Sequence, residues 1–132
     1  MDASGRMAVV ERYFTYSADE MDLAHEMYHD DSVLEFPQSG ERFEGVANFK
    51  EWRNQYPAEV EYRIRRMVSS GDHVVAEVSI RYNGGPWMFG VALFEFRGDK
   101  VARERIYVME GWEAAEWRAP WRSTTPADPP EE

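Results

Sequence analysis

The chain contains no cysteine among its 132 residues. Disulfide bonds, thiolate nucleophiles and cysteine-ligated metal sites are therefore excluded. The absence suits a reducing compartment, and we predict a cytoplasmic location. No apolar run approaches the roughly 20 residues that a membrane-spanning helix needs, and residues 1–6 lack the apolar stretch of a signal peptide. We therefore expect neither a signal peptide nor a membrane partner.

Basic residues are scarce as well, since 15 Lys and Arg stand against 25 Asp and Glu, for a formal net charge of −10. Such a field repels the phosphates of nucleic acids, and no basic stripe offsets it, so a nucleic-acid partner is excluded. No glycine-rich phosphate loop follows a strand, and no hydroxyl residue has a neighbouring His–acid pattern. We therefore expect no cofactor and no nucleophilic catalysis.

What the sequence does contain is the length of one domain, with 43% hydrophobic and 14% aromatic residues. Apolar residues at helical spacing predict three helices, over residues 6–17, 21–28 and 46–56, with a short strand over 32–36 before a turn at 38–41. Four β-branched and aromatic runs follow, over residues 59–69, 73–83, 87–97 and 100–110. Tight-turn sequences separate them. Helices followed by an antiparallel meander predict an α+β domain with the helices on one face of the sheet.

Two-residue turns at 84–85 and 98–99 would align the last three strands in rows across the sheet. The rows of the first face would be Ala76/Leu93/Glu104, Val78/Val91/Ile106, Ile80/Phe89/Val108 and Tyr82/Trp87/Glu110. This face is nearly all apolar, so we expect it to meet the helices. The opposite face is amphipathic, with Glu77 and Arg105 on either side of Ala92. A slip of one residue would exchange the two faces of a strand.

The C-terminal part is again aromatic. Trp112, Trp117 and Trp121 lie around a short helix candidate at residues 113–116, and we expect them to be buried against the sheet or over a pocket mouth. Residues 123–132 are acidic and rich in proline, which is typical of a disordered end. We therefore assign residues 1–122 to a single domain and residues 123–132 to a disordered tail.

Several short segments carry a family resemblance by their order and spacing. They are Met27-Tyr28-His29-Asp30-Asp31, Val33-Leu34-Glu35-Phe36-Pro37, Glu44-Gly45, the run Gly71 to Glu77, Asn83-Gly84-Gly85, Phe94-Glu95-Phe96 and the run Lys100 to Tyr107. Over about residues 6–121 the chain resembles the SnoaL-like proteins of the nuclear transport factor 2-like superfamily, relatives of polyketide cyclases and ketosteroid isomerases. The resemblance implies a cone-shaped α+β barrel, with three N-terminal helices packed on a curved, mainly antiparallel sheet around an apolar cavity.

The resemblance also implies a small-molecule ligand inside the cone and a homodimer formed through the outer face of the sheet. Carried over to this chain, the cavity would be lined by Tyr13, Phe36, Phe49, Trp52, Tyr56, Val78, Ile80, Phe89, Val91, Leu93, Ile106 and Val108. The strand rows place Trp87 at the edge of the same face. The aromatic members of this set, which include Trp52 and Trp87, are either stacking walls for a planar ligand or ordinary core residues.

The sequence departs from the ketosteroid isomerases at two of three catalytic positions. Their general-base aspartate precedes the proline of the first strand, where this chain has Phe36, which accepts no proton. Their partner acid falls among residues 91–93, which are apolar here. Their oxyanion tyrosine corresponds to Tyr13, which would donate a hydrogen bond to a ligand carbonyl. Steroid isomerisation by the same mechanism is therefore not expected.

Glu104 is the main candidate for acid/base chemistry. The strand rows place it on the apolar face, where an ionised carboxylate is costly unless paired, so that its pKa would rise toward neutrality. The alternative is a rim position at which the carboxylate reaches water or one of Arg63, Arg65 and Arg66. Tyr13 has a comparable alternative as a core tyrosine bonded to backbone.

His25 and His29 stand four residues apart, a spacing that can bind zinc. The H-E-x-x-H pattern and a third ligand are missing, so two surface histidines near a helix end are the preferred interpretation, and we expect no metal. Three functions stay open. The chain is an enzyme acting on an apolar carbonyl compound through Tyr13 and Glu104, a binding module with the same pocket, or an interaction domain that uses the outer sheet face.

Overall fold

The computed structural model describes residues 1–129. Helices α1 (Ala3–Tyr16) and α2 (Met21–His25) precede the first strand, and α3 (Val46–Asn54) lies between the second and third strands. The strands are β1 (Tyr28–Phe36), β2 (Glu41–Glu44), β3 (Val60–Ser70), β4 (His73–Tyr82), β5 (Met88–Arg97) and β6 (Lys100–Met109). They form one sheet in the order β2-β1-β6-β5-β4-β3, with β1 and β6 parallel and the other neighbours antiparallel.

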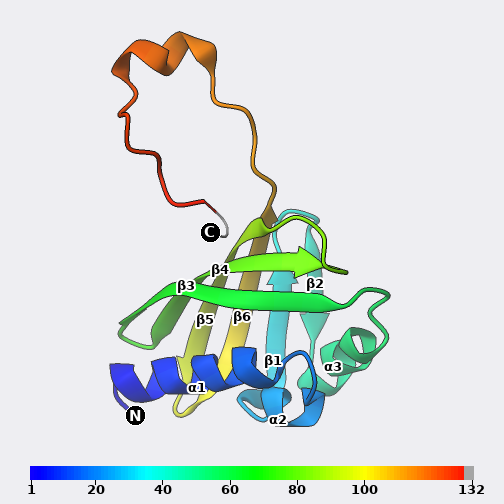
Figure 1. The fold of residues 1–132 in the computed structure, drawn as a ribbon. Helices are drawn as coiled ribbons and strands as arrows, with labels where there is room; N and C mark the ends of the chain where they lie inside the picture. The colour runs from blue at the N-terminus through cyan, green and yellow to red at the C-terminus, as the bar shows by residue number, and fades with distance from the viewer. Residues whose placement is uncertain (130–132) are drawn as a thin grey trace.

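The sheet is strongly curved, so that β3 and β4 cross in front of β6 and β1, while α1 and α3 close the concave side (Figure 1). The predicted α+β cone is confirmed. The four long strands agree with their predicted ranges within one or two residues, because β-branched runs and glycine turns delimit them. None of the helices in residues 1–129 has the length and apolarity needed to span a membrane.

Two features of the first half differ from the predictions. The second helix ends at His25 rather than at Tyr28, and β1 begins at Tyr28, four residues before the predicted strand. The early part of β1 is polar, so its sequence carries no strand pattern, and it extends because it pairs with β6 at Val101. Strand β2 was not predicted, and it pairs with β1 across the turn at residues 37–40.

The predicted register of β5 is wrong by one residue. The tight turn is centred on Asn83 and Gly84, both with positive φ (52° and 67°), and the Gly85 N–H donates to the Tyr82 carbonyl at 2.9 Å. Pairing between β4 and β5 resumes with Ile80 opposite Met88. A bulge in β6, near the turn at residues 98–99, compensates for the slip, so that the side chains of β6 lie on the predicted sides of the sheet.

The slip exchanges the two faces of β5 while leaving β4 and β6 as predicted. The alternate residues of β5 that are buried toward the helices are Gly90, Ala92, Phe94 and Phe96. The side chains of Trp87, Phe89, Val91 and Leu93 therefore belong to the outer face of the sheet and not to the interior, which corrects the prediction for these four residues.

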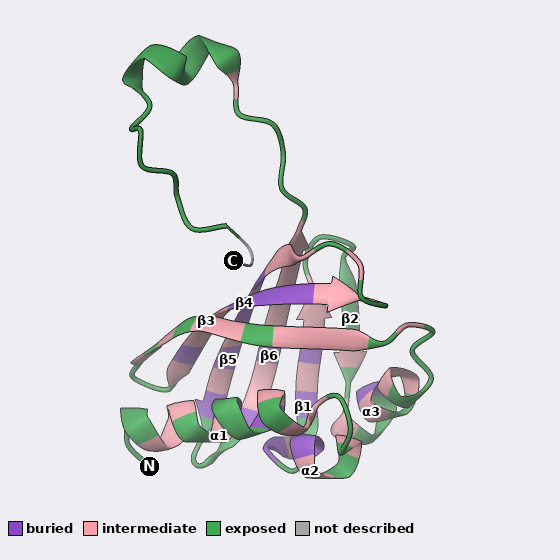
Figure 2. Cartoon of the chain, in the orientation of Figure 1, coloured by how far each residue is buried: buried purple, intermediate pink, exposed green. Residues whose placement is uncertain are grey.

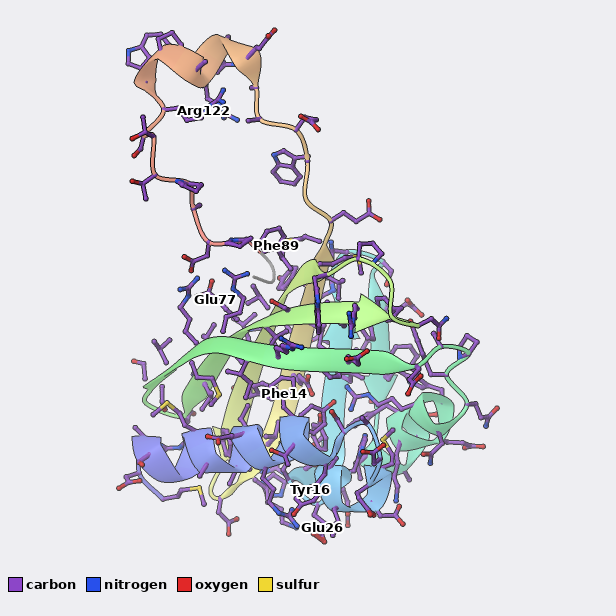
Figure 3. The ribbon with its side chains drawn as sticks, in the orientation of Figure 1. Phe14, Tyr16, Glu26, Glu77, Phe89 and Arg122 are labelled. Carbon is purple, nitrogen blue, oxygen red and sulfur yellow. The ribbon has the colours of Figure 1, made fainter. Side chains whose placement is uncertain are left out.

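The core lies between the helices and the concave face of the sheet (Figure 2). Val10 of α1, Phe49 of α3, Leu34 of β1 and Phe94 of β5 are fully buried there. Phe14 projects from α1 toward the sheet (Figure 3), and its ring centroid lies 5.4 Å from that of Tyr62. The helices thus cover this face by aromatic packing, and the polar positions within it stand out.

After Met109 the chain leaves the body as an arm, residues 110–129, that contains a short 3-10 helix, η1 (Glu116–Trp121) (Figure 1). The prediction that Trp112, Trp117 and Trp121 are buried is wrong, since they are 84%, 72% and 78% exposed. Residues 123–129 form neither helix nor strand. The last three residues of the predicted disordered tail lie outside the described residues.

Candidate functional site

A cavity of about 120 Å³ lies inside the cone, between α1, α3 and the concave face of the sheet. Its walls are mostly aromatic and aliphatic, and the lining residues are Tyr13, Ser17, Met21, Phe36, Trp52, Arg53, Tyr56, Val60, Tyr62, Ile80, Tyr82, Ile106 and Val108. A smaller void of about 20 Å³ shares several of these walls and is bordered by Glu104. The interior therefore offers one small chamber and, beside a buried carboxyl group, a void large enough for a single water molecule.

The structure brings together most of the predicted lining residues. Tyr13, Phe36, Trp52, Tyr56, Ile80, Ile106 and Val108 line the cavity, and Val78 borders the smaller void. Phe49 is instead a core residue that packs edge-on against Tyr28, with ring centroids 5.0 Å apart. The outward-facing side chains of β5 are replaced in the cavity by Tyr62 and Tyr82 from β3 and β4.

Glu104 is buried as predicted, with 1% of its surface exposed. It lies on β6 between Leu34 of β1 and Phe94 of β5, two fully buried residues. The Tyr28 hydroxyl donates to its Oε1, and Arg53 Nη2 lies 3.8 Å from the same oxygen. Burial raises the pKa of the Glu104 carboxyl, while the charge of Arg53 and the hydrogen bond from Tyr28 act in the opposite direction.

The alternative placement of Glu104 at the rim is therefore wrong. Arg63 lies over Trp87, with its guanidinium carbon 5.0 Å from the ring centroid, and Arg65 lies over Phe89 at 5.8 Å. Both contacts are on the outer face of the sheet. The cation beside Glu104 comes from a helix and not from the neighbouring strand.

Arg53 of α3 is the residue that sequence reasoning missed. Its Nη1 donates to Nε2 of His25 at 3.0 Å and to the Tyr28 hydroxyl at 3.2 Å, and its side chain also lines the cavity. It follows Phe49 by four residues and so shares the inward face of α3. That spacing was the available signal, but an arginine in a short polar helix is usually solvated.

His25 is buried, so the prediction that it is a surface histidine near a helix end is wrong. Its Nδ1 donates to the Met21 carbonyl at 2.9 Å, and its Nε2 accepts from Arg53, an arrangement that requires the neutral ring. Burial and the charge of Arg53 lower its pKa to about 4. His25 is therefore an acceptor that helps to hold the Arg53 guanidinium in place.

Tyr13 of α1 is the residue that connects the cluster to the cavity. It is buried and borders both the cavity and the smaller void. The Arg53 guanidinium carbon lies 5.7 Å from its ring centroid. Burial raises the pKa of Tyr13, so it is a neutral hydrogen-bond donor at physiological pH.

One residue of the cavity wall also carries a buried polar group without a hydrogen-bond partner. Trp52 packs against Phe36 and Phe43, and within residues 1–129 its buried Nε1 has no hydrogen-bond acceptor. A buried N–H group without a partner is unfavourable. Together with Tyr13 and Arg53, it makes the walls rich in donors, which suits a ligand with a carbonyl or other acceptor oxygen.

The two histidines have separate partners. The His29 ring pairs through Nε2 with the Arg97 carbonyl at 2.6 Å, away from the contacts of His25. In the described part of the chain, no three His, Cys, Asp or Glu side chains are grouped as metal ligands.

The comparisons with known proteins agree with this architecture. The SnoaL-like domain model matches residues 10–104. An NTF-2 like protein of unknown function from Burkholderia xenovorans LB400 is 31% identical, with a TM-score of 0.84 over 93% of this chain and 97% of that chain. A candidate ketosteroid isomerase from Kribbella flavida DSM 17836 is 22% identical, with a TM-score of 0.86 over 96% and 94%.

An LEH-like epoxide hydrolase of M. tuberculosis is 20% identical, with a TM-score of 0.71 over 80% of this chain and 84% of that chain. No curated protein matches. The Kribbella flavida and M. tuberculosis structures are under 25% identical, so they support the fold alone. The family model covers well over half of the sequence and therefore shows the family. The chain belongs to the SnoaL-like domain family and has its NTF2-like fold.

Proposed function

We propose that the interior cavity binds a small apolar or aromatic carbonyl compound, and that Glu104 moves a proton on it without a cofactor. The reaction would be of the isomerase, cyclase or dehydratase type. The observation that carries the proposal is the buried cluster of Glu104, Tyr28 and Arg53 beside an aromatic cavity. A buried carboxyl group with a raised pKa is suited to general acid/base catalysis near neutral pH.

The size of the cavity limits the ligand. At about 120 Å³ it is smaller than the roughly 300–1,000 Å³ of pockets for drug-sized ligands. An engineered protein cavity of about 150 Å³ holds benzene. A single small ring is therefore the scale of compound that fits without rearrangement.

The arrangement supports enolisation. The Tyr13 hydroxyl and the Arg53 guanidinium donate to the carbonyl oxygen, and the Glu104 carboxylate takes a proton from the adjacent carbon, with one water in the smaller void as the relay. The C–H electron pair moves to form the enolate, whose negative oxygen the two donors stabilise. The proton then returns to the same or another carbon, so that no oxidant or reductant is consumed.

Glu104→Gln is expected to abolish this proton transfer. We expect the wild type to exchange α-protons of small cyclic ketones for deuterium in D₂O, and the variant to lose roughly 100-fold or more of that rate, the usual contribution of a general base. Proton NMR of a ketone panel measures the exchange. Carboxyl NMR of the wild type, assigned by comparison with Glu104→Gln, should give a Glu104 pKa above the roughly 4.3 of a free glutamate.

The amide of Glu104→Gln has the same shape as the carboxyl group and still accepts a hydrogen bond from Tyr28, so we expect the variant to fold. Circular dichroism spectra of the variant and the wild type should therefore agree, which is the control. Equal exchange by both proteins, or a normal or depressed pKa for Glu104, would rule out the acid/base role.

The second candidate function is a binding module, which one observation favours: Glu104 borders the small void but not the larger cavity. In a binding module it would only position Arg53, and ligands would bind saturably without exchange.

For the outer face of the sheet we propose a homodimer contact. The outward residues of β5 and β6 include the apolar side chains of Val91, Leu93, Tyr107 and Met109, beside the charged Arg103 and Arg105. A sheet face that combines apolar and charged side chains in this way is suited to an isologous interface.

A further inference from the structure

The arm, residues 110–129, exposes three tryptophans that its own body does not cover. Trp112, Trp117 and Trp121 are 84%, 72% and 78% exposed, and the arm arches away from the sheet before it returns (Figures 1 and 2). Indole side chains carry large apolar surfaces that are normally buried in a core or an interface. Three of them within ten residues indicate a surface that is completed by another molecule.

The arm has local order of its own. The 3-10 helix η1 is closed by Arg122, whose Nη2 donates to the Ala115 carbonyl at 3.0 Å. The Arg118 guanidinium carbon lies 5.7 Å from the ring centroid of Trp117. A segment that is structured before binding loses less conformational entropy when it docks.

The contact that returns the arm to its own body is small. Asp128 Oδ2 lies 2.9 Å from Arg66 Nη1 and 3.4 Å from Arg65 Nη2, and Arg65 also donates to the Pro129 carbonyl. Surface ion pairs contribute little to stability, and the 18 residues from 110 to 127 must be ordered for this contact to form. The contact shows which groups the acidic end of the arm recognises, but does not account for the tryptophans.

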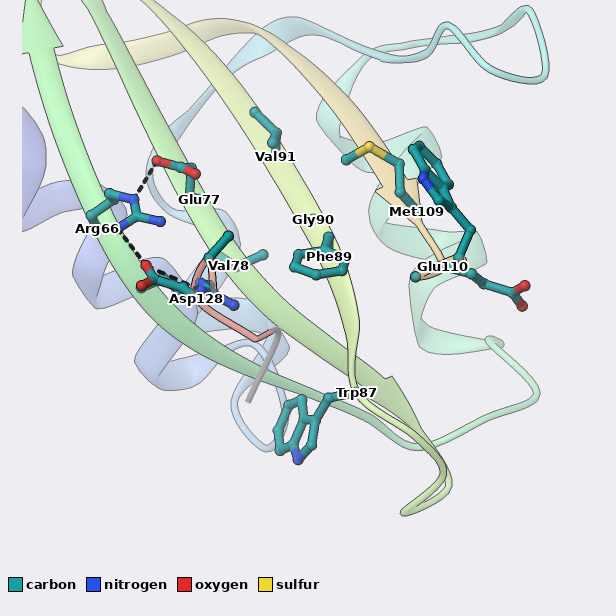
Figure 4. Close-up of a pocket in the computed structure, with 14 residues that line it drawn as sticks. Arg66, Glu77, Val78, Trp87, Phe89, Gly90, Val91, Met109, Glu110 and Asp128 are labelled. Carbon is teal, nitrogen blue, oxygen red and sulfur yellow. Dashed lines mark hydrogen bonds and ion pairs between the residues drawn. The ribbon is translucent and has the colours of Figure 1, made fainter. Parts of the chain in front are cut away.

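Those groups border an open hollow of about 920 Å³ on the outer face of the sheet (Figure 4). Its floor is apolar and includes Trp87, Phe89, Val91 and Met109. The arm forms part of the rim of this hollow, through residues 110–112 at its start and Ala127 and Asp128 near its end. An uncovered apolar floor with an arginine pair at its edge matches an arm that carries tryptophans followed by an aspartate.

We propose that the arm of one copy binds the hollow and outer sheet face of a second copy, and that the two copies exchange arms. Tryptophans bury about 150–250 Å² each, so the six indoles of two arms would supply roughly 900–1,500 Å². Stable interfaces bury about 1,200–2,000 Å² in total, so the arms and the face beneath them suffice. The inference rests on the proposed homodimer and names the element that holds it together.

Charge complementarity favours the same pairing. Each chain carries a formal charge of −10, so two copies repel at long range. In the exchanged arrangement, Asp128 of one copy meets Arg65 and Arg66 of the other, which places opposite charges together at the contact and fixes the register of the arm.

The full-length variant Trp112→Ser/Trp117→Ser/Trp121→Ser tests the inference by sedimentation velocity over a dilution series. We expect a wild-type dimer, and a dissociation constant at least 100-fold weaker for the variant. Asp128→Asn should weaken the dimer several-fold, while Asp19→Asn, which removes an exposed charge far from the arm, should leave it unchanged. In the wild type, acrylamide quenching of tryptophan fluorescence should increase on dilution to the monomer.

Mixing two defective variants tests whether the arm binds the face or the other arm. The triple tryptophan variant has an intact hollow, whereas Arg65→Ser/Arg66→Ser has an intact arm. Their mixture should form a heterodimer tighter than either homodimer, because one complete contact is restored. No gain on mixing would overturn the arm-to-face contact.

A triple variant that dimerises as tightly as the wild type would overturn the inference and leave the homodimer through the sheet face standing. A wild type that stays monomeric at 100 μM would overturn both. A monomer with tryptophans protected from acrylamide would show that the arm folds onto its own body.

Discussion

Replacing Arg53 by leucine is expected to destabilise the fold by about 3–5 kcal/mol, the usual result of removing one partner of a buried ion pair. Glu104 would lose its nearest cation, and His25 and Tyr28 would lose a hydrogen-bond donor. Without Arg53 the pKa of Glu104 rises further, because the guanidinium charge is what opposes burial. Chemical denaturation at pH 7 measures the loss.

The pH dependence gives this prediction a second readout. A carboxyl group whose pKa is raised in the folded state binds a proton on folding, so its contribution is present at low pH and is lost as the pH rises through the folded pKa. The difference in stability between wild type and Arg53→Leu should therefore shrink as the pH falls through the folded-state pKa of Glu104 and the carboxyl group becomes protonated. The double variant Arg53→Leu/Glu104→Gln should recover much of the loss at pH 7.

Lys50→Met is the matched control on the same helix. Lys50 pairs with Asp22 at the surface, so its removal should have little effect. If Arg53→Leu were no more destabilising than Lys50→Met, the buried cluster would not be a coupled unit, and the structural basis for a tuned Glu104 would be lost.

The arrangement of the strands could be predicted from sequence because the signals were local. Runs of β-branched residues between turns fixed the ranges of β3 to β6, and the alternation along β4 and β6 placed Glu104 on the inner face. The side of the sheet on which each β5 side chain lies could not be predicted from such local signals. Asn83-Gly84-Gly85 contains two overlapping turn dipeptides, and the structure uses the first, with pairing resumed beyond Pro86.

The candidate site was predicted only where a residue departed from its surroundings. A glutamate in an apolar row is conspicuous, and so Glu104 was identified. Arg53 and His25 lie in short helices of mixed polarity, where a charged or polar residue carries no sign that it will be buried. Their burial arises because α2 and α3 meet over Tyr28, a contact between segments that no local pattern encodes.

His25 should make the protein sensitive to acid. Its pKa is about 4 in the folded state against 6.5 for a free histidine, since burial and the Arg53 charge disfavour the imidazolium, with Lys50 adding to this and Asp22 opposing it. The unfolded chain therefore binds more protons between these values. The stability that the neutral ring contributes is complete above pH 6.5 and is lost as the pH falls toward 4, by roughly 2–3 kcal/mol.

His25→Gln isolates this effect, because the amide oxygen can still accept from Arg53 and the side chain does not titrate. The stability difference between wild type and His25→Gln, measured by urea denaturation from pH 4 to 8, should fall steadily below pH 6.5 and be flat above it. The titration of Glu104, which has the opposite sign, is common to both proteins and cancels to first order. A difference that does not vary with pH would mean that His25 has the same pKa in the folded and unfolded states, so that neither burial nor Arg53 acts on the ring.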